Sequence, residues 1–311
     1  MKILFMGTPD FAATILKKMI QSGHEVIGVV TQPDKQKGRG NAISFPPVKV
    51  LALENNLEVY QPVKAREAGF VQMVREMAPE VIVVAAFGQI LPKDLLDIPP
   101  YGCINVHGSL LPKYRGAAPI QYSIINGEEE TGITIMYMDV HIDTGDMILQ
   151  DKIPITPEET GGSLHDKLAV LGADLLIEAL KQIEDGTASR EKQDDSKATY
   201  VKVIDKDMGN VDFTKSAVEI EHLIRGLNPW PSAFTMIDGK TLKLWRAAVE
   251  PTDRKAEPGV VIEVRKDSLA VMTGDGLLII KELQLEGKKR MTADAFLRGY
   301  QITAGTKLGT N

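Results

Sequence analysis

The stretch MKILFMGTPDFAATILKKMIQSG, residues 1–23, joins a short apolar run directly to an amphipathic segment. The run from Lys2 to Met6 has the length and apolar character of a buried strand. Pro9 suits the first turn of a helix and Gly23 suits the position just past its end, so we predict a helix between them. The stretch predicts a strand–turn–helix unit, the repeating element of sheets whose strands are connected by helices.

The same alternation continues outward over the first 180 residues. Further strands are predicted at Val26 to Thr31, Val81 to Ala86, Cys103 to His107 and Ile133 to Met138. A helix around Phe70 is closed by Pro79, and a long helix runs from Leu164 to Ile183. This order predicts an α/β fold with a doubly wound, mostly parallel sheet, similar to a Rossmann fold.

A different pattern follows residue 186. Residues 186–206 are polar and charged without a period, which is typical of a linker. Beyond them come a helix from Ala217 to Leu227 and short strands near 242–247, 260–264, 269–273 and 277–285. We therefore expect a catalytic domain at 1–185, a linker at 186–206 and a small β-barrel of the oligonucleotide-binding (OB) type at 207–311.

Composition adds only weak constraints. The 311 residues carry a formal charge of −6 and one cysteine, Cys103, so no disulfide can form within the chain. From Lys206 onward 16 Lys and Arg face 14 Asp and Glu, against 20 and 28 before it, which permits an RNA-facing second domain without requiring one. The first apolar run is too short for a signal peptide and none is long enough for a membrane span, so we expect a cytoplasmic protein.

The turn after the first strand does not have the features of a nucleotide-binding loop. It reads Gly7-Thr8-Pro9-Asp10 and has a single glycine. Dinucleotide fingerprints and Walker loops need several glycines where the backbone approaches phosphates. A nucleotide cofactor is therefore not expected.

Polar side chains appear at the end of an apolar strand in Cys103-Ile-Asn-Val-His-Gly-Ser-Leu-Leu-Pro112. Asn105 and His107 are two apart, so they point to one face of the strand about 7 Å apart and can reach one substrate atom. They also lie at the carboxyl end of a strand, where open α/β sheets bind ligands. A hydrogen-bonded structural pair is the alternative.

A second polar cluster, Asp139 to Asp146, follows the strand at 133–138. If all strands are parallel, this turn lies at the same edge of the sheet, and Asp143 can face His107. A carboxylate beside an imidazole favours its protonated form, as a proton donor near neutral pH requires. An ordinary aspartate-rich turn is the alternative.

Two other kinds of site are conceivable. His107, His141 and Asp143 have the ligand types of a two-histidine, one-carboxylate metal site, but their spacing is not that of a known metal motif and we expect no metal. Cys103 lies about 13 Å along the strand from His107, so we expect a small buried residue rather than a nucleophile.

INVHGSLLP, followed about thirty residues later by DTGD, strongly resembles the folate-dependent formyltransferase family. The start MKILFMGTPDFA, the stretch TQPDKQKGRG at 31–40, YRGAAPIQ from Tyr114 and the second domain narrow the resemblance to the branch that acts on methionyl-tRNA. The resemblance covers nearly the whole chain. His141 departs from the small residue expected in its turn.

This resemblance implies a site and a reaction. Asn105, His107 and Asp143 look like the catalytic trio, which would transfer a formyl group from 10-formyltetrahydrofolate to an amine by direct attack, with Asn105 and protonated His107 stabilising the oxyanion. The folate site would include Asp139, the signature Ser109-Leu110-Leu111-Pro112 and the pterin loop Phe87-Gly88-Gln89-Ile90-Leu91.

The resemblance also implies that the amine belongs to initiator methionyl-tRNA. The basic stretch with Lys35, Lys37 and Arg39 would enter the acceptor stem, with Arg39 as the contact that selects the initiator. Apart from the resemblance, the basic residues Lys288, Lys289, Arg290 and Arg298 are predicted to line a groove for the tRNA backbone on the barrel, whereas Trp245 is expected in the core rather than as a base-stacking platform. We expect a monomer. A formyltransferase acting on an amino-sugar nucleotide is the alternative function.

Overall fold

The computed structural model describes residues 1–37 and 42–309. The chain forms two compact units. The first contains residues 1–119, 130–154 and 165–202, and the second contains residues 120–129, 155–164 and 203–311. No helix in the described ranges is long and apolar enough to cross a bilayer.

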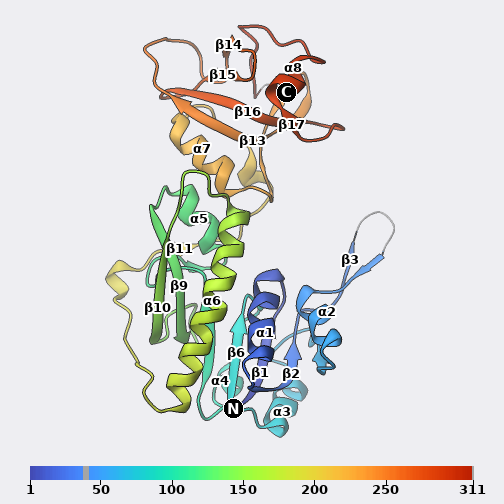
Figure 1. Cartoon of the computed structure of the whole chain (residues 1–311), viewed down its shortest axis with the longest axis vertical. Coiled ribbons are helices and arrows are strands. Elements are labelled where there is room, and N and C mark those ends of the chain that lie inside the picture. Colours follow the sequence, from blue (N-terminus) through green and yellow to red (C-terminus); the bar gives the residue numbers. More distant parts are fainter. Residues whose placement is uncertain (38–41, 310–311) are drawn as a thin grey trace. The chain divides into compact units, whose positions relative to one another are not determined.

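The first unit is built on a seven-stranded sheet in the order β10-β9-β7-β6-β1-β2-β5 (Figure 1). Its strands are β1 (Lys2–Gly7), β2 (Glu25–Val30), β5 (Val59–Tyr60), β6 (Val81–Ala85), β7 (Cys103–His107), β9 (Glu130–Tyr137) and β10 (Met147–Pro154). The helices are α1 (Asp10–Gln21), α2 (Pro47–Glu54), α3 (Ala68–Met77), α4 (Lys93–Leu96) and, mostly within this unit, α6 (Gly161–Glu184). Two short pairs complete it: β3 (Lys35–Lys37) with β4 (Ala42–Ser44), and β8 (Arg115–Gly116) with β11 (Tyr200–Val201).

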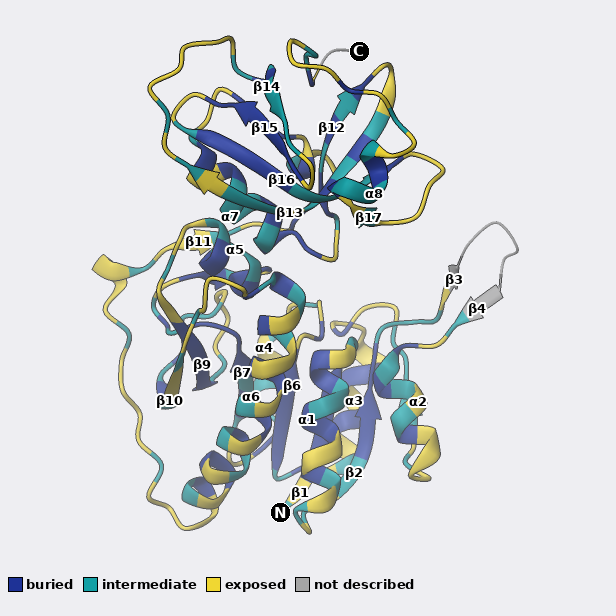
Figure 2. Cartoon of the chain, turned by 45° about the horizontal axis from the view of Figure 1, so that its top comes forward, coloured by how far each residue is buried: buried dark blue, intermediate teal, exposed yellow. Residues whose placement is uncertain are grey.

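Apolar side chains explain the central strands. β1 and β6 are buried along nearly their whole length, and α1 covers them with its one buried face, as Figure 2 shows. Gly7 ends β1 where an added Cβ would lie 2.6 Å from the Ala12 Cβ, so glycine allows α1 to start against the sheet. The predicted strands at 2–6, 26–31, 81–86 and 103–107 and the helix between Pro9 and Gly23 are confirmed.

The strand predicted at 133–138 exists as β9, but its expected parallel direction is wrong. β9 is antiparallel to β7, with His107 opposite Thr134 and Ile104 opposite Tyr137. A parallel strand would need a crossover that returns the chain to the start of β7. Residues 108–129 make no such return, so the chain enters β9 where β7 ends and runs in the opposite direction.

The second unit contains an antiparallel sheet in the order β12-β13-β16-β15-β14, with β17 beside β16. Its elements are α7 (Ala217–Gly226), β12 (Ala233–Ile237), β13 (Lys240–Glu250), β14 (Val261–Val264), β15 (Leu269–Met272), β16 (Leu277–Leu285), β17 (Met291–Thr292), α8 (Ala293–Leu297) and the short η2 (Asp207–Gly209), together with most of α5 (Pro119–Ile125). A capping box between Ser216 and Glu219 starts α7. The predicted helix and four predicted strands of this region are confirmed.

Residues 186–202 form part of the first unit. They contain η1 (Asp195–Lys197) and β11, and β11 pairs with β8. Glu191 and Met147 also exchange backbone hydrogen bonds of 2.8 and 3.0 Å. Most of the segment predicted as a linker therefore packs on the domain that carries the candidate site.

Candidate active site

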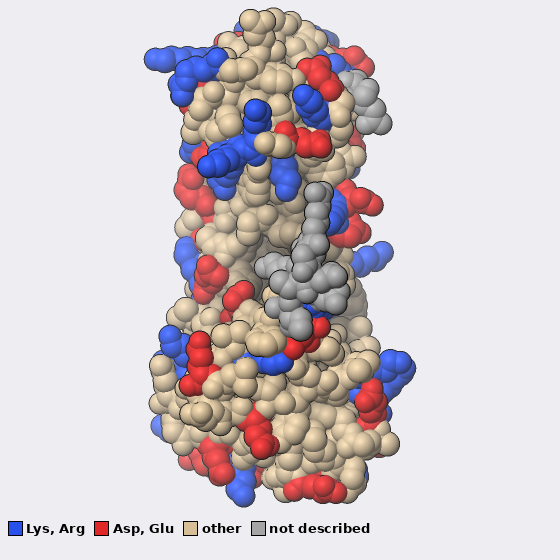
Figure 3. All heavy atoms as spheres, turned by 90° about the vertical axis from the view of Figure 1, so that its right-hand side faces the viewer, with Lys and Arg blue, Asp and Glu red and all other residues tan. Residues whose placement is uncertain are grey.

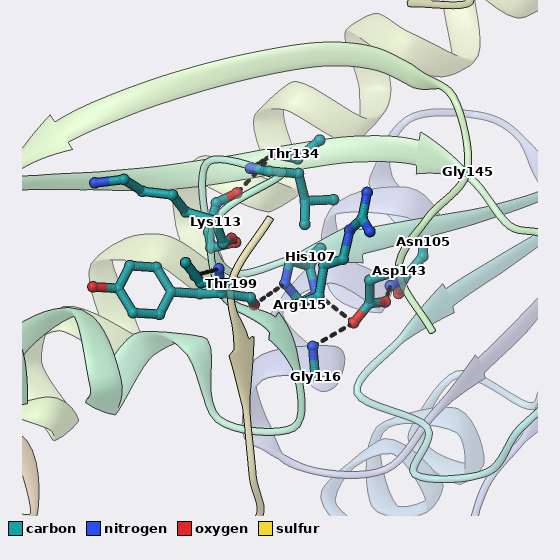
Figure 4. Close-up of polar contacts among 12 residues, drawn as sticks. Asn105, His107, Lys113, Arg115, Gly116, Thr134, Asp143, Gly145 and Thr199 are labelled. Carbon is teal, nitrogen blue, oxygen red and sulfur yellow. Dashed lines mark hydrogen bonds and ion pairs between the residues drawn. The ribbon is translucent and has the colours of Figure 1, made fainter. Parts of the chain in front are cut away.

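The structure brings Asn105, His107 and Asp143 together (Figure 4). Asn105 and His107 project from one face of β7. Asp143 Oδ2 lies 3.6 Å from His107 Nδ1, and Asn105 Nδ2 donates to Asp143 Oδ1 at 3.4 Å. The side chains of His107 and Asp143 are only 6% and 15% exposed, so water screens their charges weakly.

Both ring nitrogens of His107 face oxygen atoms. Nε2 lies 2.9 Å from the Tyr114 carbonyl oxygen, which can only accept a hydrogen bond, so Nε2 is the donor. Nδ1 faces the Asp143 carboxylate.

Asp143 reaches His107 by a route different from the one predicted. Because β9 is antiparallel to β7, its last residue lies near the start of β7, where Met138 N donates to Cys103 O at 2.7 Å. The following turn then folds back over the sheet. The Asp139 carboxylate shapes this turn by accepting hydrogen bonds from His141 N at 2.9 Å and Thr144 Oγ1 at 2.6 Å.

Asp143 itself has a positive φ of 54°. This left-handed conformation is uncommon for a residue other than glycine, although aspartate tolerates it. Such a conformation persists where the surrounding contacts over-determine it. The contacts around Asp143 therefore matter for the geometry of the site.

One such contact comes from the main chain of β8. Gly116 N donates to Asp143 Oδ2 at 2.8 Å. The φ of Gly116 is 114°, and an added Cβ would lie 2.2 Å from the Val201 carbonyl oxygen. Only glycine fits this position, because β11 passes close to the main chain of β8 there.

Two residues beside Asp143 were not predicted from the sequence. Gln193 Nε2 donates to the carbonyl oxygens of Asp143 and Gly145, both at 2.9 Å, and Gln193 Oε1 accepts from Arg115 Nε and Nη2 at 3.0 and 2.9 Å. Arg115 is 1% exposed and also contacts Asp195 Oδ1 at 2.7 Å. Burial disfavours its charge, but the hydrogen bonds to Asp195 and Tyr200 raise the pKa of Arg115 above its ordinary value. Arg115 could have been identified from the sequence, because it is a charged residue beside the glycine of the YRG motif. No sequence feature marks Gln193 as a site residue.

The turn at Ser109 to Pro112 is held from β9. Thr134 Oγ1 donates to Ser109 O at 2.7 Å and accepts from Leu111 N at 3.1 Å, while Ser109 Oγ donates to Lys113 O at 2.6 Å. The side chains of Ser109 and Leu111 are buried, and Leu110 and Pro112 are partly buried. Thr134 was not predicted either; a polar residue within an apolar strand was the signal.

The loop after β6 forms a second border of the region. The Phe87 carbonyl oxygen accepts hydrogen bonds from Gln32 Nε2 at 3.0 Å and Thr8 Oγ1 at 3.3 Å. Gln89 Oε1 accepts from Ala65 N at 2.6 Å. Phe87 and Leu91 are buried in a cluster against which Met138 also packs, so this loop and the Asp143 turn start from one apolar base.

Two residues of that loop are open to solvent. Gly88 has a φ of 80° and is exposed, and Ile90 is 72% exposed. The exposed isoleucine, two residues after the exposed glycine, offers an apolar contact in a loop with accessible main chain. Such a surface suits a flat heterocycle.

The predicted nucleic-acid contacts are only partly described. Lys35 is exposed on β3, nothing is described of the Lys37 side chain, and Arg39 lies outside the described residues. Lys288 and Lys289 are exposed, and Figure 3 shows Lys and Arg side chains gathered on a face of the second unit, with carboxylates among them.

Trp245 is not in the core as expected. It is half-buried, with the Arg290 guanidinium 4.9 Å and the Lys243 ammonium 5.7 Å from its ring. Its indole Nε1 donates to Gln284 Oε1 at 3.2 Å. The tryptophan ring therefore lies close to two cations.

His141 and Cys103 take no part in the trio. His141 is exposed, and the described residues include no group of three or more His, Cys, Asp or Glu that could hold a metal ion. Cys103 is buried as predicted, and burial raises the pKa of its thiol to about 12. This thiol stays protonated near neutral pH.

Comparison with known proteins places the chain in a family. Residues 1–180 match the formyl transferase family, and residues 203–301 match its C-terminal domain. Among structures, a sugar 3N-formyl transferase is similar with a TM-score of 0.68 and 22% identity, covering 93% of this chain and 99% of that one. An N-formyltransferase from Helicobacter canadensis has a TM-score of 0.66 and 19% identity, covering 94% and 100%. These similarities show the fold.

Sequence relatives are much more similar. The methionyl-tRNA formyltransferase of Agathobacter rectalis is 53% identical over 98% of this chain and 99% of its own length. That of Clostridioides difficile is 52% identical over 99% and 100%. With both domains matched and half of all residues shared from end to end, the chain belongs to the methionyl-tRNA formyltransferase family.

Proposed function

We propose that this enzyme transfers the formyl group of 10-formyltetrahydrofolate to the amino group of initiator methionyl-tRNA. The observation that carries the proposal is the assembled trio of Asn105, His107 and Asp143 in a member of this family. The Helicobacter canadensis relative was solved with folinic acid, which supports a folate donor. The enzyme would work as a monomer in the cytoplasm, where charged tRNA is made and used.

The chemistry is a direct acyl transfer. The neutral amine attacks the formyl carbon, and the oxygen gains negative charge in the tetrahedral intermediate. The C–N10 bond then breaks, N10 takes up a proton and the amine nitrogen loses one. An α-amine has an ordinary pKa of about 8, so enough of it is neutral at physiological pH without a strong base.

Asn105 and His107 would stabilise the oxyanion in different ways. The Asn105 amide has one hydrogen on Asp143 and a second that can point to the formyl oxygen. Removing such a donor costs about 3 to 4 kcal/mol in comparable sites. Since both nitrogens of His107 face protein oxygens, its contribution would be the positive charge of the ring rather than a direct hydrogen bond.

Asp143 would hold that ring in place and relay the proton. Its carboxylate faces His107 Nδ1, and its second oxygen contacts Asn105, so it touches both other members of the trio. A carboxylate at this position can take a proton from the attacking amine and return it to N10.

The donor would bind along the two loops beside the trio. Exposed Ile90 and the accessible main chain at Gly88 would receive the pterin, together with Asp139 and the main chain of the Ser109 to Pro112 turn. Because the Ser109 hydroxyl donates to Lys113 O, this serine would act by shaping the turn rather than by contacting folate.

The tRNA would be held by basic residues in both units. Lys35, Lys37 and Arg39 would meet the acceptor stem. On the second unit, Lys288, Lys289 and Arg290 would contact phosphates, and Trp245 offers a ring for stacking.

The test is transfer of labelled formyl from 10-formyltetrahydrofolate to charged initiator methionyl-tRNA, elongator methionyl-tRNA and an amino-sugar nucleotide in parallel. Rapid formylation of the initiator alone supports the proposal. Activity on the sugar alone would instead assign the alternative function that the sugar-modifying structural neighbours suggest.

Arg39→Ala should reduce the preference for the initiator, whereas Arg75→Ala on the exposed surface of α3 should not.

A further inference from the structure

The Gln193 side chain makes four hydrogen bonds beside the trio, and the proposed mechanism gives it no role. It lies in the polar segment after α6, yet its amide is satisfied on both sides. Its nitrogen donates to the Asp143 and Gly145 carbonyl oxygens, and its oxygen accepts two bonds from Arg115. This network fixes the orientation of the amide, since Arg115 can only donate.

The contact falls at the point of strain in the turn. Asp143 has a positive φ, and Gln193 binds the carbonyl oxygen of this same residue. Gly145, two residues further on, is close-packed as well, because an added Cβ would lie 1.8 Å from the Tyr137 carbonyl oxygen. Two hydrogen bonds from one amide therefore span the segment whose conformation sets the direction of the Asp143 carboxylate.

Arg115 connects this amide to the other side of the site. It lies between Tyr114, whose carbonyl oxygen accepts from His107, and Gly116, whose N–H donates to Asp143. Arg115 N donates to Thr199 O at 2.8 Å, so the segment that carries Gln193 also holds β8. The guanidinium is almost completely buried, and its fork of donors fits the Gln193 oxygen through two bonds.

We infer that Gln193 and Arg115 are positioning residues, which hold the Asp143 turn in its strained conformation and so set the distance between Asp143 and His107. Neither has to touch substrate. The inference rests on the proposed function, because it concerns the rate of formyl transfer. A displacement of about 1 Å in a catalytic group can reduce the rate by about 100-fold, so a positioning pair should affect kcat strongly.

Gln193→Glu is the decisive variant because it separates the two halves of the contact. A glutamate at this position keeps an oxygen for Arg115 and gains a charge opposite to it, so the anchor remains. Its other oxygen cannot donate and would face two carbonyl oxygens, so the hold on the turn is lost. The matched control is Gln72→Glu on the exposed surface of α3, which makes the same chemical change away from the site.

The expected result is a fall in kcat of roughly 10- to 100-fold for Gln193→Glu, with the KM for 10-formyltetrahydrofolate within about twofold of the parent value. The melting temperature should fall because two carbonyl oxygens lose their donor, but the enzyme should remain folded at the assay temperature. Arg115→Lys, which keeps the charge but not the fork, should lower kcat in the same direction with the same unchanged KM. A variant that only disturbs the fold should show a lower melting temperature together with a higher KM, whereas loss of positioning lowers kcat and leaves KM unchanged.

Two outcomes would overturn the inference. One is a folded Gln193→Glu enzyme whose kcat lies within about threefold of the parent; the other is a rise in KM that accounts for the whole loss. If Gln193→Glu does not fold, Arg115→Lys decides by the same criteria. Failure of the proposed function is distinct, since the parent enzyme itself would then leave methionyl-tRNA unformylated.

Discussion

Replacing Asp143 with asparagine removes one charge while keeping the size and shape of the side chain. The new amide oxygen can still accept the hydrogen bond from Gly116 N and face His107, so the fold of the turn should survive. What is lost is the attraction between the carboxylate and a protonated imidazole, whose nearest atoms are 3.6 Å apart. The variant therefore removes the charge of Asp143, and with it the capacity to relay a proton, while the size and shape of the side chain stay the same.

The expected loss follows from that distance. Two unit charges near 4 Å attract by about 4 kcal/mol at an effective dielectric constant near 20. Since each 1.36 kcal/mol corresponds to a factor of ten in rate, the full attraction is equivalent to about three orders of magnitude. Relaxation of the neutral site recovers part of this, so we expect kcat to fall by about 100- to 1,000-fold.

The assay is steady-state formylation of initiator methionyl-tRNA with the donor concentration varied, beside the control Asp151→Asn on the exposed part of β10. The KM for 10-formyltetrahydrofolate should stay within about threefold, because Asp143 acts on the reacting atoms rather than on the pterin. A kcat within tenfold of the parent, or equal losses in kcat and donor affinity, would refute the reasoning.

Three further variants and measurements probe the surroundings of the trio. Thr134→Val leaves buried partners of the hydroxyl unsatisfied, so urea titration should show a loss of about 2 kcal/mol or more; an unchanged midpoint would contradict this. Ile90→Ser should raise the donor KM roughly three- to tenfold at an unchanged kcat, and a normal KM would remove this side chain from the folate site. Cys103 should resist iodoacetamide at pH 8 in the native enzyme, since its thiol is buried with a pKa of about 12, and react once guanidinium chloride unfolds the chain; fast native labelling would disprove its burial.

The parallel core of the first unit was predictable because its central strands β1 and β6 are apolar over nearly their whole length. β1 and β6 stand out from any neighbouring segment in hydrophobicity. The edge strand β10 was not predicted, because Gln150, Asp151 and Lys152 are three consecutive exposed residues that interrupt its apolar pattern. A strand whose exposed residues are consecutive shows neither a continuous apolar run nor a regular alternation, which are the signals on which such a prediction depends.

The residues of the candidate site could be predicted from the sequence, but the path of the chain that brings them together could not. The two-residue spacing of Asn105 and His107 placed them on one face, as β7 has them. Asp143 was expected nearby from a parallel β9, and it is nearby although β9 runs the other way. The turn after β9 folds back over the sheet and so brings Asp143 to His107 despite the antiparallel direction of β9. This turn is held by a hydrogen bond from Gln193, about fifty residues away in the sequence. No local sequence pattern predicts such a long-range contact.

Residues 114 and 116 hold the trio through main-chain atoms, which affects how mutations at these positions should behave. His107 is held by the carbonyl oxygen of Tyr114 and Asp143 by the amide of Gly116, and every amino acid supplies a carbonyl oxygen. A codon change at Tyr114 cannot delete its carbonyl oxygen; it can only displace the chain that carries it. Alleles of Tyr114 should therefore be conditional, functioning at low temperature and failing when the cell is warmed, whereas alleles of the trio itself should fail at every temperature.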